Sequence, residues 1–243
     1  MIHLGDDAWL AEVMARPVFR VGGALDGDGD GAALAAHVRG QARAFYYAKV
    51  DAAAITTVRR LAAAGFVVVD TNVVFELDRR PELAGPFPGV SVGEHVAAEE
   101  EAVVEVAATS FTRTRFHLDP LVGAELANAI KREWCRNYAL KRRGDHLFVA
   151  RVDGRPAGFL AALVTPTSAV IDLIGVAPAF QRRKVGAALT AAFVERYRGR
   201  GALQVGTQVA NIPSVRLYER MGFSLASSQY VLHLHIEKGT PRG

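Results

Sequence analysis

The stretch Ile171–Ala188 (IDLIGVAPAFQRRKVGAA) carries the clearest chemistry in the chain. An apolar strand pattern ends at Pro178, and a short polar loop with one glutamine and three consecutive basic residues, Arg182–Lys184, follows it. Gly186 and a helix that begins with small residues come next. Such a loop directs unpaired backbone N–H groups and the positive end of a helix at one point. The segment therefore predicts a site for a pyrophosphate.

The same stretch resembles a known signature. The GCN5-related N-acetyltransferases (GNAT superfamily) bind acetyl-CoA with a Q/R-x-x-G-x-G/A pattern preceded by V-x-P, and the residues at the corresponding positions are Val176, Pro178, Gln181, Gly186 and Leu189. Downstream, Asn211–Phe223 (NIPSVRLYERMGF) resembles the N-x-x-[SA]-x-x-x-Y-x-x-x-G-F segment of that superfamily. The two segments occur in the superfamily's order, so the chain is identified as a GNAT member by resemblance.

Lys184 departs from this signature, because the first motif glycine would stand at its position. Lysine reaches positive φ less readily than glycine does. We therefore expect either a slightly different loop or a direct contact between the Lys184 side chain and a phosphate.

The resemblance implies acetyl-CoA as co-substrate and direct transfer to an amine. Strands Leu173–Val176 and Leu203–Gln208 would splay apart, and the pantetheine arm would lie between them like an extra strand. A backbone N–H near Ile174 or Gly175 would face the developing oxyanion. The residues implied to bind acetyl-CoA are Ile174, Gly175, Val176, Gln181, Arg182, Arg183, Lys184, Val185, Gly186, Ala187, Asn211, Ser214 and Tyr218.

Tyr218 occupies the superfamily's usual position for the catalytic proton donor. A phenol has an unperturbed pKa of ~10, above the ~8.5 of a thiol, so it can protonate the leaving thiolate. Seven residues, about two helical turns, separate Asn211 from Tyr218, which places both on one helix face. The alternative is a core tyrosine on an amphipathic helix.

The elements that must position these residues form a mixed α/β pattern, with an antiparallel start and a helix-crossover finish. We expect a GNAT fold with a central, mixed, splayed β-sheet flanked by helices. Its predicted helices are Ala97–Ala108, Gly123–Arg142, Val185–Tyr197 and Pro213–Met221. Its predicted strands are His146–Val152, Gly158–Thr165, Ala169–Val176, Leu203–Val209 and Gln229–Ile236.

A break at Arg79–Gly93, with three prolines and three glycines, predicts a linker. We therefore expect a small α/β domain over residues 1–92 and the acetyltransferase domain over 93–238. The small domain shows a strand, a helix that ends at Gly65, and a second strand, Phe45–Val50, Ala53–Ala64 and Phe66–Leu77. The same order recurs at Leu203–His235, which suggests a degenerate half-copy.

The layout resembles the bacterial acetyltransferases of dTDP-4-amino-4,6-dideoxygalactose (dTDP-fucosamine). The similar segments are Leu61–Leu77, Arg115–Pro120 with the helix after it, and Val205–Asn211. This resemblance implies an acceptor amine on a nucleotide-linked sugar, with exposed basic residues (Arg113, Arg115, Lys131, Arg132) facing its diphosphate and aromatic rings stacking on it. The implied acceptor residues are Arg115, His117, Asp119, Trp134, Asn137, Tyr138 and Gln208.

Several alternatives stay open. The acceptor is otherwise another small amine, an antibiotic or a protein N-terminus, and a different class is a non-catalytic GNAT that senses acyl-CoA. Core packing is the alternative for Trp134, and hydrogen bonding within its loop is the alternative for His117.

Composition sets the outer limits. With 243 residues, 50% hydrophobic and 22% charged, the chain is neither disordered, collagenous nor a coiled coil. Its apolar stretches are shorter than the ~20 residues of a membrane span, and Asp6 and Asp7 argue against a secretory signal. The single cysteine, Cys135, allows no internal disulfide, is expected to be buried, and fits a cytoplasmic protein.

The charges divide unevenly. Residues 1–120 hold 11 Lys and Arg against 17 Asp and Glu, and residues 121–243 hold 18 against 8, so the second half has a net charge of +10. This surplus favours an anionic partner there. No nucleic-acid-binding motif accompanies it, so we expect nucleotide phosphates and no nucleic acid. A homodimer is left open.

Two metal-like patterns are set aside. Asp26–Gly31 imitates the start of a calcium loop, but His37 stands at the twelfth position, where a glutamate is required. His233 and His235 alternate along a strand and face one side, yet the sequence shows no third ligand beside them. We expect no metal.

Overall fold

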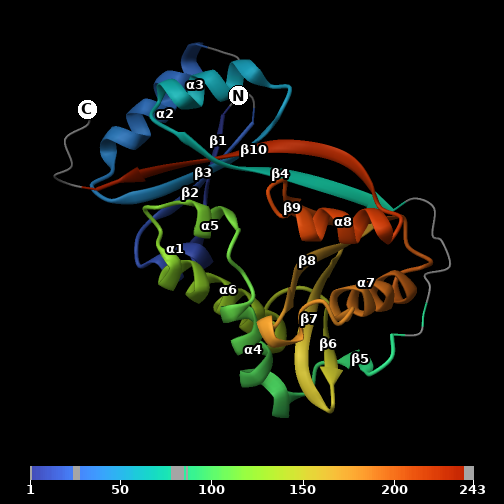
Figure 1. Ribbon diagram of the computed structural model, residues 1–243. Helices are drawn as coiled ribbons and strands as arrows, with labels where there is room; N and C mark the ends of the chain where they lie inside the picture. Colours follow the sequence, from blue (N-terminus) through green and yellow to red (C-terminus); the bar gives the residue numbers. More distant parts are fainter. Residues whose placement is uncertain (1, 24–27, 78–84, 86, 238–243) are drawn as a thin grey trace. The chain divides into compact units, whose positions relative to one another are not determined.

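The helices and strands of the computed structural model fall into two units (Figure 1). The structure describes residues 2–23, 28–77, 85 and 87–237. Unit 1 comprises Met1–Asn72, Thr114–Gly123 and Ser227–Gly243, and unit 2 comprises Val73–Arg113 and Ala124–Ala226. Strand β4 (Val67–Leu77) begins in unit 1 and ends in unit 2. Strand β10 (Ser224–Ile236) begins in unit 2 and ends in unit 1.

Unit 1 is built on strands in the order β1-β2-β3-β10-β4. Strands β2 and β3 are parallel, whereas β3 and β10 are antiparallel, with Phe45 opposite His235 and Tyr47 opposite His233. Its core gathers apolar side chains of the strands and of α2 and α3. The further elements of this unit are β1 (His3–Asp6), α1 (Ala8–Met14), β2 (Val18–Gly22), α2 (Asp28–Gly40), β3 (Ala44–Asp51), α3 (Ile55–Ala63) and α5 (Arg115–Leu118).

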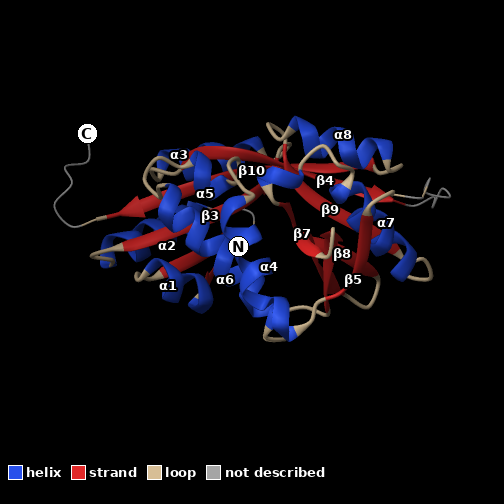
Figure 2. Cartoon of the chain, turned by 60° about the horizontal axis from the view of Figure 1, so that its bottom comes forward, coloured by secondary structure: helices blue, strands red, loops and turns tan. Residues whose placement is uncertain are grey.

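Unit 2 carries strands in the order β4-β9-β8-β7-β6-β5. Strands β5 to β8 pair antiparallel and β8 pairs parallel with β9. One apolar cluster packs α7 and α8 on the sheet, and a second packs α4 and α6 (Figure 2). The elements are β5 (Val90–Glu94), η1 (Ala97–Glu99), α4 (Glu100–Thr109), α6 (Ala124–Ala139), β6 (His146–Val152), β7 (Arg155–Val164), β8 (Ser168–Val176), η2 (Pro178–Phe180), α7 (Val185–Arg196), β9 (Ala202–Gln208) and α8 (Ile212–Arg220).

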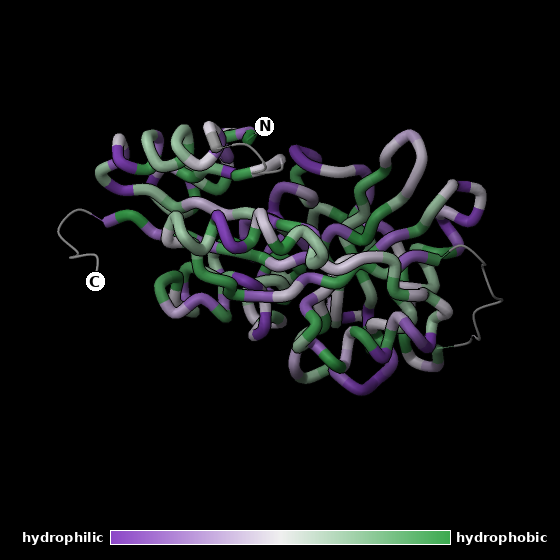
Figure 3. Tube along the Cα trace, turned by 90° about the horizontal axis from the view of Figure 1, so that it is seen from above, coloured by the Kyte–Doolittle hydropathy of each residue, from purple (hydrophilic) through white to green (hydrophobic). Residues whose placement is uncertain are grey.

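Local sequence explains where several elements begin and end. The Asp7 carboxylate accepts a hydrogen bond of 3.1 Å from Leu10 N and caps α1. Gly65 follows α3 with a φ of +94°, a left-handed conformation that glycine adopts without strain. Hydrophobic residues, green in Figure 3, are interspersed with hydrophilic ones along the chain, and apolar residues bury faces of the strands in each unit. None of the helices within the described residues is long and apolar enough to cross a membrane.

The predicted fold class is confirmed: the protein is mixed α/β, with helices on a mixed sheet. The predicted elements of unit 2 all occur, and β6 has the predicted limits. The sequence pattern did not reveal β1, α1, β2, α2, β5 or the short helix α5. The two units divide the chain differently from the predicted boundary between residues 92 and 93, because residues 73–77 belong to unit 2 and segments 114–123 and 227–237 belong to unit 1. That boundary stays a prediction. Asp26 and residues 79–84 and 86 of the predicted linker lie outside the described residues, and residues 90–93 of that linker belong to strand β5.

Candidate active site

Strands β8 and β9 separate at their carboxyl ends. Their parallel pairing runs from Ser168 opposite Ala202 to Ile171 opposite Val205 and ends there. Strand β8 continues to Val176 while paired with β7 on its other side, and β9 continues to Gln208. The predicted splay is therefore present, and it leaves strand-edge backbone groups available to an extended ligand.

A β-bulge lies where the strands part. Ala161 of β7 is opposite Leu173, whereas Ala162 is opposite Ile171, so Asp172 is the extra residue on β8. Bulges bend a strand and increase its twist, and they are frequent beside active sites. The bulge therefore gives a local cause for the departure of β8 from β9.

The Asp172 carboxylate fastens the end of α6 to this bulge. Its Oδ2 atom accepts hydrogen bonds from Trp134 Nε1 at 2.9 Å, Tyr138 Oη at 2.7 Å and Arg143 Nε at 2.9 Å. Burial alone would raise the pKa of Asp172, but the hydrogen bonds from Arg143 and Tyr138 hold that pKa below its usual value. Asp172 is consequently ionised and holds three donors.

The loop after β8 leads into α7 with an unusual backbone. Pro178–Phe180 form one 3₁₀ turn, and Arg182 and Lys184 have φ values of 63° and 60°. The left-handed region costs a side-chain-bearing residue about 1–2 kcal/mol. Lys184 adopts the left-handed conformation that glycine reaches more readily. Alternation of this kind turns successive N–H groups toward one point, as anion-binding loops require.

The other residues of the predicted cofactor site lie around this loop. Gln181 and the three basic residues after it are exposed, and Gln181 Nε2 donates a weak 3.4 Å hydrogen bond to the carbonyl oxygen of Val176. A Cβ atom added at Gly186 would stand 3.3 Å from Leu217 Cδ2 of α8, so a larger residue there would push on that helix. Gly186 and Ala187 thus keep the first turn of α7 slim.

Asn211 and Ser214 connect the end of β9 to α8. The Asn211 side-chain amide donates to Ser214 Oγ at 2.8 Å and to Thr207 Oγ1 at 3.3 Å. These two hydrogen bonds fix the turn that follows the splayed end of β9, and Pro213 in the first turn suits a helix start.

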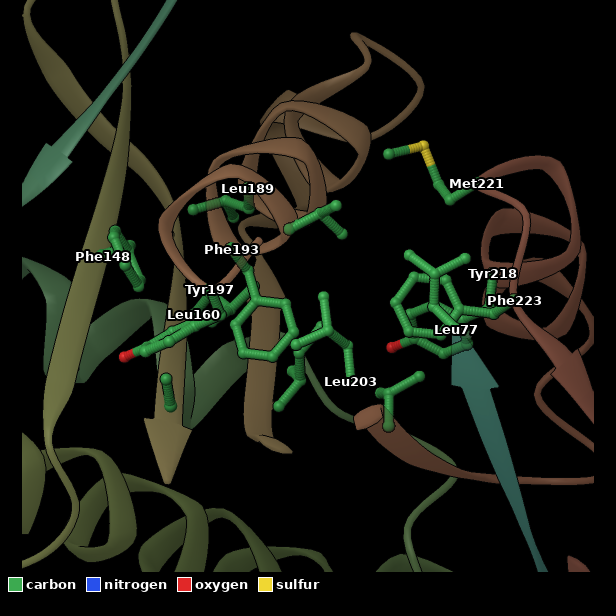
Figure 4. Close-up of a cluster of buried hydrophobic side chains, with 14 of the residues drawn as sticks. Leu77, Phe148, Leu160, Leu189, Phe193, Tyr197, Leu203, Tyr218, Met221 and Phe223 are labelled. Carbon is green, nitrogen blue, oxygen red and sulfur yellow. The ribbon is translucent and has the colours of Figure 1, made fainter. Parts of the chain in front are cut away.

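Tyr218 lies inside the apolar cluster of unit 2 (Figure 4). Its ring centroid is 5.9 Å from that of Phe75 and 6.0 Å from that of Phe223, and the residue is 2% exposed. Burial raises the pKa of its hydroxyl above the usual value. Tyr218 therefore keeps its proton at neutral pH, which a proton donor requires.

The predicted acceptor residues of unit 1 form a buried network. Arg115 was expected to be exposed, but its guanidinium lies 4.2 Å from the Tyr47 ring centroid and 4.1 Å from that of Phe116. It also donates to His233 Nε2 at 3.1 Å, and burial lowers its pKa to about 10. Aromatic rings and a histidine surround the guanidinium, so Arg115 is not an exposed residue, and its contact with an acceptor phosphate stays a prediction.

Asp119 and His117 are held in the same unit. The Asp119 carboxylate, 3% exposed, accepts from both histidines of β10 and from Leu121 N at 2.9 Å. His117 Nδ1 lies 2.7 Å from Thr114 Oγ1, a hydrogen bond within its own segment. The structure thus joins Asp119 to histidines that the sequence analysis had set aside.

Two of the predicted acceptor residues of unit 2, Trp134 and Tyr138, contact Asp172. Trp134 and Tyr138 meet at its carboxylate, and Tyr138 is buried, so its ring has no exposed face for stacking. Lys131 was expected to be exposed but is buried, with Nζ 4.5 Å from the Trp134 ring centroid. The Asn137 carbonyl accepts from Arg142 N at 2.8 Å where α6 ends, and the Gln208 carbonyl accepts from Asn211 N at 2.9 Å.

The acetyltransferase (GNAT) family profile matches residues 102–223, half of the chain. The chain belongs to this family. Members of this family use acetyl-CoA as co-substrate. The matched range contains the splay, the bulge, the loop and Tyr218, so the site described above is the part of the chain that the family shares.

Individual relatives agree with this membership. SpsD of Bacillus subtilis, a spore coat polysaccharide biosynthesis protein, is 34% identical over 63% of this chain and 50% of its own length. An uncharacterized N-acetyltransferase of Methanocaldococcus jannaschii is 34% identical over 38% of this chain and 46% of its own. The chain spans about half the length of the curated relatives it matches. A GCN5-related N-acetyltransferase from Sphaerobacter thermophilus has the same fold, with a TM-score of 0.66 at 16% identity over 99% of this chain and 78% of that one.

Two residues of this GNAT site were missed from sequence, Asp172 and Arg143. Asp172 is the single charged residue in the apolar strand segment AVIDLIGV, which is a signal for a buried charge with a partner. Arg143 follows the end of α6 among other basic residues, and nothing in the sequence marks it among them.

Proposed function

We propose that this enzyme transfers the acetyl group of acetyl-CoA directly to the amine of a nucleotide-linked amino sugar of the dTDP-4-amino-4,6-dideoxyhexose type. One observation supports the binding of acetyl-CoA: strands β8 and β9 separate beyond Ile171 and Val205. The loop with positive φ at Arg182 and Lys184 follows β8 and leads directly into α7. An opened strand edge suits the amide groups of a pantetheine arm, and a helix start suits its phosphates.

In the proposed complex the pyrophosphate lies on the backbone N–H groups of the loop and the first turn of α7. The exposed side chains of Arg182, Arg183 and Lys184 add positive charge around it. The pantetheine arm follows β8 along Ile174–Val176, and Asn211 and Ser214 hold the opposite side of the opening through their mutual hydrogen bond.

The reaction then needs no acyl-enzyme. The acceptor nitrogen attacks the thioester carbonyl, the C–N bond forms, and a backbone N–H at Ile174 or Gly175 stabilises the oxyanion. The C–S bond breaks, and Tyr218 donates its proton to the leaving thiolate. The attacking nitrogen loses one proton to solvent or to a base as the amide forms, and the Tyr218 phenolate takes up one proton from solvent, so charge and protons balance.

The amino-sugar acceptor rests on the resemblance to dTDP-fucosamine acetyltransferases and on the polysaccharide role stated for SpsD. The positive surplus of residues 121–243 supports a second anionic nucleotide in addition to CoA. Of the predicted acceptor residues, Trp134 is half-buried, so part of its side chain is accessible for stacking. An acetyltransferase domain over 93–238 and a cytoplasmic location are parts of the same proposal.

A panel of acceptors tests it. The enzyme is given acetyl-CoA with dTDP-amino sugars, aminoglycosides, polyamines and N-terminal peptides, and CoA release is followed with a thiol reagent. We expect kcat/KM at least tenfold higher for a dTDP-amino sugar than for any other acceptor. Faster acetylation of a peptide or an antibiotic would overturn the acceptor, and failure of acetyl-CoA to bind by calorimetry would overturn the cofactor site.

A further inference from the structure

A buried cluster in unit 1 joins Asp119, a predicted acceptor residue, to two histidines that have no part in the proposed acetyl transfer. His233 and His235 alternate on β10, and both rings face the carboxylate of Asp119. His233 Nδ1 lies 2.6 Å and His235 Nε2 lies 2.8 Å from Asp119 Oδ2. The donor atoms of the three residues all lie within 4.8 Å of one another. The third ligand, missing from the sequence pattern, is therefore present in space.

The cluster is closed off from solvent. His233 is 2% exposed, Asp119 is 3% exposed and the side chain of His235 is 8% exposed. The Phe45 ring lies 4.7 Å from the His233 ring centroid and 4.9 Å from that of His235. Apolar walls around nitrogen and carboxylate donors strengthen a bond to a cation, because little water competes there.

The two histidines differ in how readily a ring nitrogen becomes available as a ligand for a cation. His235 Nδ1 is buried and has no hydrogen-bond partner among the residues that the structure describes. The hydrogen bond to Asp119 places the ring proton on Nε2, and binding of a cation at Nε2 would move that proton to Nδ1, where no hydrogen-bond partner opposes it. His233 Nε2 accepts from Arg115, and a metal on Nδ1 would require the proton at Nε2 instead. Arg115 is therefore a competitor of any bound cation.

The chemical types of the three ligand atoms indicate which metal ion the cluster would bind. Two imidazole nitrogens and one carboxylate oxygen suit Zn²⁺, with bonds of about 2.0–2.2 Å and four ligands. A tetrahedral site of that size needs about 3.3 Å between ligand atoms, so the two short donor pairs must open by roughly 0.6 Å. An Fe²⁺ site of the same ligands keeps up to three open positions, and the burial of this cluster leaves no room for them.

We propose that Asp119, His233 and His235 bind a zinc ion that fastens β10 to the segment Thr114–Gly123 within unit 1. A water completes the four ligands, and the ion is structural because the closed surrounding leaves no place for a substrate. Each imidazole binds as the neutral ring with its proton on the outer nitrogen, and Arg115 turns away from His233 Nε2 while keeping its contacts with Tyr47 and Phe116.

Metal titration of the tag-free full chain tests this site. The chain is stripped with EDTA, dialysed and titrated with Co²⁺, whose visible absorption reports four-coordinate nitrogen and oxygen ligation, and Zn²⁺ is then added as competitor. We expect one Co²⁺ per chain, displacement by one Zn²⁺, and a Tm higher by about 5–10 °C with zinc in hundredfold excess over its Kd. An absorption no different from free Co²⁺ and an unchanged Tm would overturn the proposal.

Variants separate a metal site from a hydrogen-bond network. His235→Gln keeps an N–H donor toward Asp119 but supplies no imidazole, and we expect it to abolish the Co²⁺ absorption while the chain still folds. His146→Ala, which removes a histidine of unit 2 paired with Glu94, is the control and leaves binding unchanged. Arg115→Met should tighten Zn²⁺ binding by at least about tenfold, because the competing donor is gone. Equal metal binding by His235→Gln and the parent chain would show that these residues form hydrogen bonds only.

Discussion

Trp134 Nε1 lies 2.9 Å from Asp172 Oδ2, at the residue where β8 bulges and stops pairing with β9. The same oxygen accepts hydrogen bonds from the hydroxyl of Tyr138 and the guanidinium of Arg143. One carboxylate therefore joins α6, the residues after it and the bulged strand. Helix α6 therefore supports the splay on which the proposed acetyl-CoA site depends. This helix belongs to the second apolar cluster, on the face of the sheet opposite to α7.

Substitution of Asp172 tests this support. Asp172→Ala leaves the buried hydroxyl of Tyr138 and the half-buried indole of Trp134 without this acceptor, and we expect a loss of about 2 kcal/mol in the free energy of unfolding. Asp172→Asn keeps one acceptor oxygen and should lose about 1 kcal/mol. Urea unfolding at pH 7 measures both. Equal stability of Asp172→Ala and the parent chain would show that the network adds nothing.

The same network predicts an acid dependence. The folded pKa of Asp172 is below its usual value, so its stabilising contribution is present above the unfolded pKa of about 3.9 and is lost as pH falls through the folded value. In Asp172→Asn this component is absent. The difference in unfolding free energy between the parent chain and Asp172→Asn should therefore shrink below pH 4. Urea titrations of both chains at pH 7 and pH 3 would show this.

Features formed by residues close together along the chain could be predicted from the sequence, whereas contacts between residues far apart along the chain could not. Gly65, Pro178 and Gly186 act within a few residues, so the ends of α3 and β8 and the phosphate loop were visible as local patterns. Asp119 meets His233 across 114 residues, and Asp172 meets Trp134 across 38. No spacing rule relates such pairs, and the bulge that turns Asp172 inward depends on the register with β7.

The N-terminal elements were missed for a different reason. Helix α2 starts in an alternation of glycine and aspartate (DGDG) that favours a turn by residue type. Acidic residues at a helix start are nonetheless favourable to the helix dipole, and Leu34 and Val38 bury its apolar side. Packing therefore outweighed local preference at this helix.

Lys184 in the left-handed region predicts a trade between stability and binding. Lys184→Gly relieves the backbone strain, so it should be more stable to urea than Lys184→Ala by about 1 kcal/mol. Both variants lose the same positive charge, and both should bind acetyl-CoA more weakly than the parent chain by calorimetry. Unchanged binding in both would assign the phosphate contact to the backbone alone.

Cys135 should be inert in the native protein. It is fully buried in α6, and burial raises the pKa of its thiol to about 12. The thiolate fraction at pH 8 is then about three orders of magnitude below that of a free cysteine. A chromogenic disulfide reagent should label one thiol per chain in urea and none in buffer over the same minutes. Rapid labelling in buffer would show that α6 opens readily.

Tyr218→Phe is the sharpest test of the proposed proton donor. The change removes one buried hydroxyl and keeps the ring between Phe75 and Phe223, so the fold and the Kd for acetyl-CoA should stay as they are. With no acid to protonate the leaving thiolate, kcat should fall by about 10²-fold.

Tyr197→Phe is the matched control, because Tyr197 is another buried tyrosine of unit 2 whose hydroxyl has no partner within the described residues. It should leave kcat unchanged. Because burial raises the pKa of Tyr218, kcat of the parent chain should also show no loss from phenol ionisation up to pH 10. A kcat that survives Tyr218→Phe would assign the proton to solvent and Tyr218 to core packing.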